Sequence, residues 1–114
     1  MYAAHMYCAN LTVILDYNKF QETGPISREV ALEPLADKWF SFGWHVETVD
    51  GHDLGAVIST LKRVQTVKDK PQIIVAHTVK GKGVSFVEAD FTYHGRALNP
   101  DEAVRAREEI NAAG

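Results

Sequence analysis

The chain has 114 residues, of which 46% are hydrophobic and 24% are charged, and its formal net charge is -3. This length and composition suit one soluble globular domain with a single core. Lysines and arginines are scattered among acidic residues, so no nucleic-acid partner and no membrane partner is expected. Neither a signal peptide nor a membrane-spanning run is recognisable, so we expect a cytoplasmic protein. The single cysteine excludes an internal disulfide and a cysteine metal cluster.

The first elements lead to a polar loop. Residues Met1–Ala9 predict the last turns of a helix, with Asn10 as its left-handed stop. The apolar, β-branched run Leu11–Asp16 predicts a strand. Turn-forming residues in 19–28 indicate a loop. The carboxyl end of this strand is therefore a place where an open parallel sheet would present groups to a ligand.

The middle of the chain predicts a helix, a strand and a second helix. Pro34 is expected at the first position of a helix with one apolar face, which Gly43 ends. The alternating run Trp44–Val49 predicts a strand. Asp53 is expected to cap a helix that carries apolar residues at helical spacing from Leu54 onward.

The last third completes an α/β pattern. The uninterrupted apolar run Gln72–His77 predicts a strand buried on both faces, and a charged helix is expected from Asn99 through Ile110. Strands that alternate with helices predict a three-layer α/β/α fold with a small parallel sheet of about three strands. Such a thin sheet leaves an apolar edge unpaired, so we expect an oligomer or a partner chain.

Polar residues follow each predicted strand, and parallel strands bring them to one edge: Asn18, His52, and Lys80 with His94. Lys80-Gly81-Lys82-Gly83 combines cations with flexible backbone and suits a phosphate. Taken alone, each signal has a simpler explanation. Asn18 tolerates turns, a Lys-Gly-Lys-Gly stretch is often a solvated turn, and a lone loop histidine is usually exposed.

The order of three segments carries more information than any one of them. In chain order they are LDYNKFQETG, then EPLADKWFSFGWHVETVDGHDL, then KPQIIVAHTVKGKGVSFVEADFTYHGRAL. Together they resemble the transketolase family, specifically the later part of its N-terminal, thiamine-diphosphate-binding domain. The resemblance covers nearly the whole chain, so residues 1–114 are expected to form part of that domain.

The resemblance implies a role for several residues. Asn18 and the backbone carbonyl of Phe20 match ligands of the family's magnesium, a cation that prefers oxygen. Lys80 matches a lysine that approaches the diphosphate of the cofactor, whose charge an ammonium offsets. His94, in Tyr93-His94-Gly95, matches a histidine near the diphosphate and the substrate, and we expect it to be the catalytic residue that handles protons. His52 and Asp53 are expected to be structural.

The chain also departs from the family pattern. No Gly-Asp-Gly segment occurs in the sequence, although its aspartate supplies the family's charged magnesium ligand. Met1 aligns inside a helix and is expected to be an internal methionine used as a start. The glutamate that protonates the cofactor belongs to the family's next domain. The thiamine diphosphate and Mg²⁺ site is therefore expected to be incomplete, and the isolated chain to be inactive.

These observations leave two main hypotheses. The first is a fragment or subunit for two-carbon ketol transfer between sugar phosphates, which needs a complementary transketolase chain or a homo-oligomer. The second is a non-catalytic remnant that oligomerises and binds no cofactor, because a fold needs only its core pattern whereas function needs a complete site. A subunit whose partner supplies Gly-Asp-Gly is a third possibility. Deoxyxylulose-phosphate synthases share the Lys-Gly-Lys-Gly and His-Gly features but fit the other segments less well.

Overall fold

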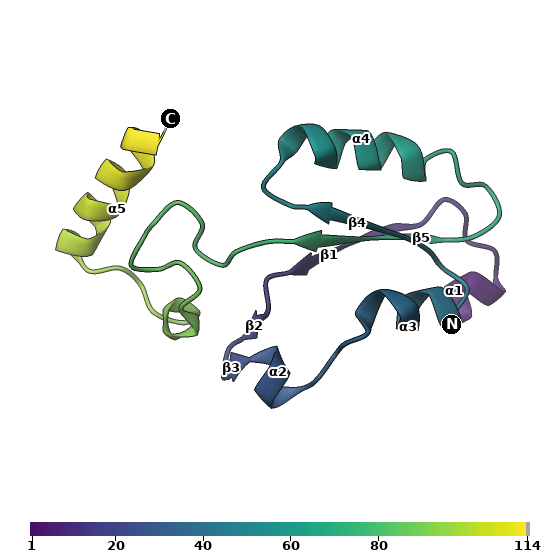
Figure 1. Cartoon of the computed structure of the whole chain (residues 1–114), viewed down its shortest axis with the longest axis horizontal. Helices are drawn as coiled ribbons and strands as arrows, with labels where there is room; N and C mark the ends of the chain where they lie inside the picture. The colour runs from purple at the N-terminus through teal and green to yellow at the C-terminus, as the bar shows by residue number, and fades with distance from the viewer. Residues whose placement is uncertain (114) are drawn as a thin grey trace. The chain divides into compact units, whose positions relative to one another are not determined.

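The structure is a computed structural model that describes residues 1–113 (Figure 1). The contacts within the chain divide it into two compact units. The first unit contains Met1–Tyr17 and Leu32–Thr78, and the second contains Asn18–Ala31 and the chain from Val79 onward. Each unit is described by itself.

The first unit is built on a parallel sheet. Its strands are β1 (Thr12–Tyr17), β4 (His45–Asp50) and β5 (Gln72–His77), in the order β1-β5-β4, and both neighbours run parallel to β5. The central residues of β5, Ile73 and Ile74, are 0% and 2% exposed although they point to opposite faces. The sequence prediction of a third strand buried on both faces is therefore confirmed.

Helices cover both faces of this sheet. Helix α4 (Leu54–Val64) lies on one side, while α1 (Tyr2–His5) and α3 (Leu35–Ser41) lie on the other (Figure 1). The main core forms between α4 and the sheet, where Val49, Val64, Ile74 and Ala76 are buried and pack with Ala56, Val57 and Leu61. The three-layer α/β/α arrangement with a small parallel sheet agrees with the prediction.

The N-terminal helix is shorter than predicted. It ends at His5 rather than near Ala9, and the left-handed residue that follows is Tyr7, with φ of 52°, not Asn10. Exposed Tyr7 takes this conformation where Asn or Gly is usual. The prediction placed the turn at Asn10 because asparagine readily adopts a positive φ. In the structure Tyr7 adopts it instead.

The caps of the two longer helices in this unit differ in origin. Asp53 caps α4 as predicted, since its Oδ1 accepts the backbone N–H of Ala56 at 2.9 Å. Pro34 is the N-cap residue of α3, not its first helical residue, which corrects the prediction. Pro34 has no side-chain acceptor, and the cap comes instead from Glu33, whose Oε2 accepts the N–H of Leu35 at 2.9 Å.

The second unit begins with a small hairpin where the sequence indicated only a loop. Strands β2 (Phe20–Gln21) and β3 (Gly24–Pro25) pair antiparallel, and one helical turn, α2 (Ile26–Glu29), follows. The unit continues with the short 3-10 helix η1 (Phe91–Tyr93) and ends with α5 (Pro100–Ala113). Helix α5 confirms the predicted charged C-terminal helix.

Helix α5 is fastened to the segment that follows Lys80-Gly81-Lys82-Gly83. Glu109 accepts hydrogen bonds from the backbone N–H of Ser85 at 2.5 Å and from its hydroxyl at 2.9 Å. These bonds hold the pKa of Glu109 below its usual range. Arg105 also places its guanidinium 4.6 Å from the ring centre of Phe86. Loop and helix therefore form one packed element of the second unit.

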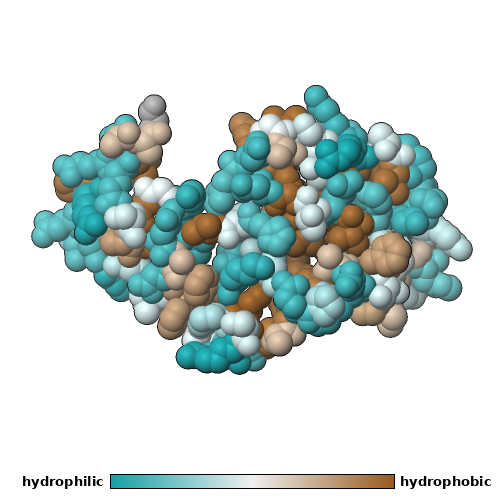
Figure 2. Space-filling model, in the orientation of Figure 1, coloured by the Kyte–Doolittle hydropathy of each residue, from teal (hydrophilic) through white to brown (hydrophobic). Residues whose placement is uncertain are grey.

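The surface is mixed in character. Figure 2 shows apolar side chains exposed between hydrophilic ones, and the exposed apolar residues include Ile14 of β1, which is 60% exposed. Among residues 1–113, no helix has the length and apolar character needed to cross a membrane.

Candidate functional site

The carboxyl edge of the parallel sheet, in the first unit, holds a group of polar contacts. The hydroxyl of Thr78 donates a short hydrogen bond to Oδ1 of Asp16, which ties the ends of β1 and β5 together. The N–H of Gly51 donates to the carbonyl of His77 at 2.8 Å. A Cβ atom at Gly51 would lie 2.5 Å from Cγ2 of Thr78, so this close approach requires glycine. His52 lies two residues after the end of β4, at the edge where the sequence placed it.

Tyr17 closes the same edge through a hydrogen bond that the sequence did not predict. Its hydroxyl donates to Oε1 of Glu33 at 2.6 Å, and its ring packs edge-on against His77 at 5.5 Å between ring centres. Tyr17 is only 5% exposed. The hydrogen bond to the Glu33 carboxylate, with burial and the carboxylate charge, raises the pKa of Tyr17 to about 12. The phenol is therefore neutral throughout the physiological range and serves as a fixed donor.

Asn18 and Phe20 lie together in the turn that begins the second unit. Oδ1 of Asn18 accepts the backbone N–H of Phe20 at 2.9 Å, which is an Asx-turn. Lys19, between them, has a positive φ of 70°. An amide oxygen carries two lone pairs, so the turn leaves one acceptor position on Asn18.

The carbonyl of Phe20 points away from β3. Ile26 donates its N–H to the carbonyl of Lys19 at 3.0 Å, so Phe20 and Pro25 form a non-hydrogen-bonded pair of the hairpin. One turn thus offers two neutral oxygens, a donor set that suits a hard cation with phosphate as its other ligand. In residues 1–113, no group of three or more His, Cys, Asp or Glu side chains is gathered in a way that could hold a metal.

The Lys-Gly-Lys-Gly loop has a backbone that depends on its glycines. Gly81 has φ of 73°, and a Cβ there would lie 2.8 Å from the carbonyl oxygen of Val87. Gly83 has φ of 92°, but the space where its side chain would be is open. The carbonyl of Lys80 accepts the N–H of Ala89 at 2.9 Å, which closes the loop. Gly81 therefore serves packing, whereas the space beside Gly83 is free of neighbouring atoms.

Glu88 occupies part of this loop. Its Oε1 lies 3.3 Å from Nζ of Lys82 and accepts the N–H of Gly83 at 3.2 Å. An anion of the chain itself thus takes two donors of the predicted phosphate loop, those of Lys82 and Gly83, but it is not shown to contact Lys80. The sequence reasoning missed Glu88, although an acidic residue shortly after a cationic glycine loop is a signal that could have drawn attention to it.

His94 follows η1 and is exposed. Its backbone N–H donates to the carbonyl of Phe91 at 3.0 Å. Asp90 caps η1 by accepting the N–H of Thr92 at 2.8 Å. The hydroxyl and N–H of Thr92 hold the pKa of Asp90 below its usual range, and the charge of Lys80 adds to this effect.

The structure brings one pair of the predicted residues together, since Asn18 and Phe20 share one turn. Lys80 and His94 both belong to the second unit, and Lys80 lies near enough to Asp90 for its charge to act on that carboxylate. Among the hydrogen bonds and ion pairs of residues 1–113, none joins Lys80 to His94. In that described part of the chain, no hydrogen bond joins either of them to Asn18 or Phe20. The assigned roles of these four residues stay predictions.

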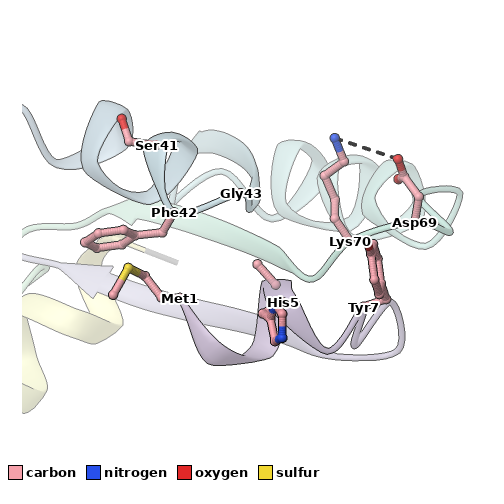
Figure 3. A pocket seen from close by; sticks show the side chains of 9 residues that line it. Met1, His5, Tyr7, Ser41, Phe42, Gly43, Asp69 and Lys70 are labelled. Carbon is pink, nitrogen blue, oxygen red and sulfur yellow. Dashed lines mark ion pairs between the residues drawn. The ribbon is translucent and has the colours of Figure 1, made fainter.

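A pocket of about 530 Å³ opens in the first unit (Figure 3). It lies at α1, the end of α3 and the turn before β5, and an ion pair of 3.8 Å between Lys70 and Asp69 forms part of its wall. The residues that line it are Met1, Ala4, His5, Tyr7, Ser41, Phe42, Gly43, Asp69 and Lys70. None of the four predicted site residues is among them.

The fold and the position of the polar segments define a class of protein, the α/β ligand-binding domains. A parallel α/β layer with polar groups after its strands is typical of domains that bind a ligand at that edge. The chain belongs to the transketolase family, because the family described as "Transketolase, thiamine diphosphate binding domain" matches residues 1–113. The resemblance found in the sequence is confirmed.

Similar proteins agree with this family. The chain is 36% identical over 114 residues to the 6-deoxy-6-sulfo-D-fructose transketolase subunit SqwG of Clostridium sp., covering 100% of this chain and 42% of that protein. It is 36% identical over 108 residues to one of the subunits of the apulose-4-phosphate transketolase of Actinobacillus succinogenes, covering 95% and 39%. The chain thus spans less than half the length of these relatives.

Solved structures show the same fold. The transketolase of Campylobacter jejuni superimposes with a TM-score of 0.88 at 24% identity, over 96% of this chain and 17% of that one. The transketolase of Pichia stipitis in complex with sedoheptulose-7-phosphate gives a TM-score of 0.86 at 26% identity, over 96% and 16%.

Proposed function

We propose that this chain is a fragment or subunit of a thiamine-diphosphate-dependent transferase that moves a two-carbon ketol unit between sugar phosphates. We further propose that it acts in the cytoplasm. The observation that supports this most is the Asn18–Phe20 turn, which offers two oxygens to a cation in a chain of the thiamine-diphosphate-binding family.

Each site residue has a proposed part. Oδ1 of Asn18 and the carbonyl of Phe20 would hold Mg²⁺, and the ammonium of Lys80 would offset the diphosphate charge. The exposed imidazole of His94 would contact the substrate and exchange protons with it near neutral pH. Thiamine diphosphate, when bound, supplies the carbanion stabilisation that the transfer requires.

The groups that this chain offers to magnesium and the cofactor do not make a complete site. Two neutral oxygens leave the divalent cation without a charged protein ligand, and residues 1–114 contain no Gly-Asp-Gly. The relatives from Clostridium and Actinobacillus are named as transketolase subunits. We propose that a complementary transketolase chain, or a second copy of this one, brings the missing carboxylate and the acid that activates the cofactor.

The first unit offers a surface for such a partner. Strand β1 lies at an edge of the sheet, and Ile14 on this strand is 60% exposed although it is in register with buried Ile74. An apolar edge strand is a ready site for pairing with another chain. This feature supports a partner but is equally expected for the alternative described below.

A chimera tests the proposed function directly. The segment of the Clostridium relative that aligns with this chain would be replaced by residues 1–114, and two-carbon transfer would be measured with that enzyme's other chains present. We expect activity that Lys80→Ala and His94→Ala each lower by tenfold or more, about 1.4 kcal/mol or more in transition-state stabilisation. A folded, assembled chimera whose activity does not depend on Lys80 or His94 would refute the proposed roles.

The second candidate is a non-catalytic remnant that keeps the core and oligomerises through the β1 edge. The complete core of the first unit and the exposed Ile14 favour it. Cofactor binding separates the two candidates, because a remnant has no reason to bind thiamine diphosphate in a magnesium-dependent way.

A further inference from the structure

The two residues that flank His94 and Gly95 are both attached to one carboxylate, that of Glu102. Arg96 donates from Nη1 to Oε2 of Glu102 at 2.8 Å and from Nη2 to Oε1 at 2.5 Å, which is a bidentate pair. The hydroxyl of Tyr93 donates to Oε1 of the same carboxylate at 3.4 Å. The loop that carries His94 is therefore closed at both ends.

Arg96 also contacts Tyr93 directly. Its Cζ lies 4.5 Å from the centre of the Tyr93 ring, within the range of a cation–π contact. Nη2 of Arg96 lies 3.4 Å from the Tyr93 hydroxyl. The guanidinium thus contacts both the Tyr93 side chain and the Glu102 carboxylate.

Glu102 is itself fixed at the start of α5. Its Oε2 accepts the N–H of Asn99 at 2.9 Å, and its own N–H donates to Oδ1 of Asn99 at 2.9 Å. These reciprocal bonds form a capping box. The carboxylate therefore holds Arg96 from a position that the first turn of a 14-residue helix defines.

We propose that Glu102 and Arg96 are positioning residues. They hold the backbone at His94 in a fixed position relative to the first turn of α5. The exposed imidazole gains a defined location from the Tyr93–Arg96–Glu102 bracket, and a group that acts on a substrate requires such a location. The importance of this location for the reaction rests on the proposed function. The bracket itself is a property of the chain and can be measured without a ligand.

The test is backbone ¹⁵N relaxation on the full chain, with His94 and Gly95 as reporters. Arg96→Ala removes the bracket and leaves the cap of α5 intact. Glu102→Gln removes the charge that holds Arg96, while glutamine still serves in a capping box. Arg107→Ala, at an exposed position of α5, is the matched control for loss of an arginine.

We expect N–H order parameters near 0.85 for His94 and Gly95 in the unchanged chain, and values of about 0.6 or below in Arg96→Ala and Glu102→Gln. The amides of α5 should be unaffected, and Arg107→Ala should change neither region. Order parameters at His94 and Gly95 that stay the same in both bracket variants would overturn the proposal. An equal loss along α5 would also overturn it, since the bracket would then only support the helix.

A parallel titration with thiamine diphosphate and Mg²⁺ keeps this proposal separate from the proposed function. Ordered reporters that loosen as expected, in a chain that binds no cofactor, would uphold the bracket and contradict a residual cofactor site in the chain alone. Cofactor binding by a chain whose reporters do not respond to Arg96→Ala would uphold that site and overturn the bracket.

Discussion

The carboxylate of Glu88 lies 3.3 Å from the ammonium nitrogen of Lys82, so the second lysine of the Lys-Gly-Lys-Gly loop is already paired with an anion. Both side chains are partly exposed, which makes the pair a weak contributor to stability. Its importance is chemical. Lys82 forms an ion pair with Glu88, whereas Lys80 lies only within reach of the charge of Asp90, so we expect the two lysines to differ in their response to a phosphate.

Substitution of the two lysines should reveal this difference. Lys80→Ala is expected to weaken binding of thiamine diphosphate with Mg²⁺ by about tenfold or more, the usual cost of losing a charge-assisted hydrogen bond. Lys82→Ala, the matched control, should weaken it by less than about threefold, because Glu88 already offsets that charge. Calorimetric titration measures both. Equal losses would show that the Glu88 pair does not distinguish the lysines.

Removal of the Glu88 carboxylate should strengthen anion binding at the loop, whereas removal of Lys80 should weaken it. Glu88→Gln takes a negative charge away from Lys82 and from the N–H of Gly83. We expect inorganic pyrophosphate to bind about threefold to tenfold more tightly to this variant, as measured by calorimetry at low salt. Unchanged or weaker binding would mean that the loop around Gly83 is not a place where anions bind.

The Asn18 turn can be tested by adding and removing an oxygen. Asn18→Ala loses the acceptor for the N–H of Phe20 and should lower the free energy of unfolding by about 0.5–1.5 kcal/mol. Asn18→Asp keeps that acceptor and adds charge, so it should bind Mg²⁺ about threefold to tenfold more tightly. Denaturant unfolding and metal titration measure the two effects. An aspartate variant with no gain in affinity would argue against a cation at this turn.

The Tyr17–Glu33 hydrogen bond predicts a particular dependence on alkaline pH. The folded pKa of Tyr17, about 12, lies above the ordinary value of 10.0, so the bond stabilises the fold fully below pH 10.0 and is lost as pH rises toward 12. This raised pKa corresponds to about 2–3 kcal/mol at most.

Near-ultraviolet titration of tyrosinate measures this effect. A step near pH 12 is expected from Tyr17, and Tyr17→Phe should remove that step. The substitution should also cost about 1.5–3 kcal/mol of stability at neutral pH, as for a hydrogen bond to a charged group. A spectrum with no tyrosinate step near pH 12, or one that Tyr17→Phe leaves unchanged, would contradict the geometry of this contact.

The main helices and strands could be predicted from the sequence, because burial of one or both faces imposes a recognisable pattern of apolar residues on each of them. The run Gln72–His77 could be identified as a two-sided strand from its apolar continuity, and Asp53 could be identified as a cap because its partner lies three residues away. Local features that depend on distant partners were less accessible. The cap of α3 comes from Glu33, which also accepts a hydrogen bond from the hydroxyl of Tyr17, a residue of β1.

The candidate site shows the same limit. The resemblance to the transketolase family indicated Asn18, Lys80 and His94, but it could not show that Glu88 pairs with Lys82 or that Arg96 and Tyr93 meet on Glu102. Those contacts depend on how the loop after β5 folds back on itself and on α5. The Asn-x-x-Glu pattern of Asn99 and Glu102 was a legible capping signal, yet its second role as an anchor for Arg96 required coordinates.

Calorimetric titration of the full chain with thiamine diphosphate, with and without Mg²⁺, tests the central claim most directly. We expect heat of binding only when Mg²⁺ is present, with a Kd on the order of 0.1–1 mM for an incomplete site, and a loss of that heat in Asn18→Ala. Thiamine without the diphosphate should give none. Absence of magnesium-dependent heat at millimolar thiamine diphosphate, in a chain shown to be folded, would contradict the claim that this chain keeps a cofactor site and favour a remnant that has kept the fold alone.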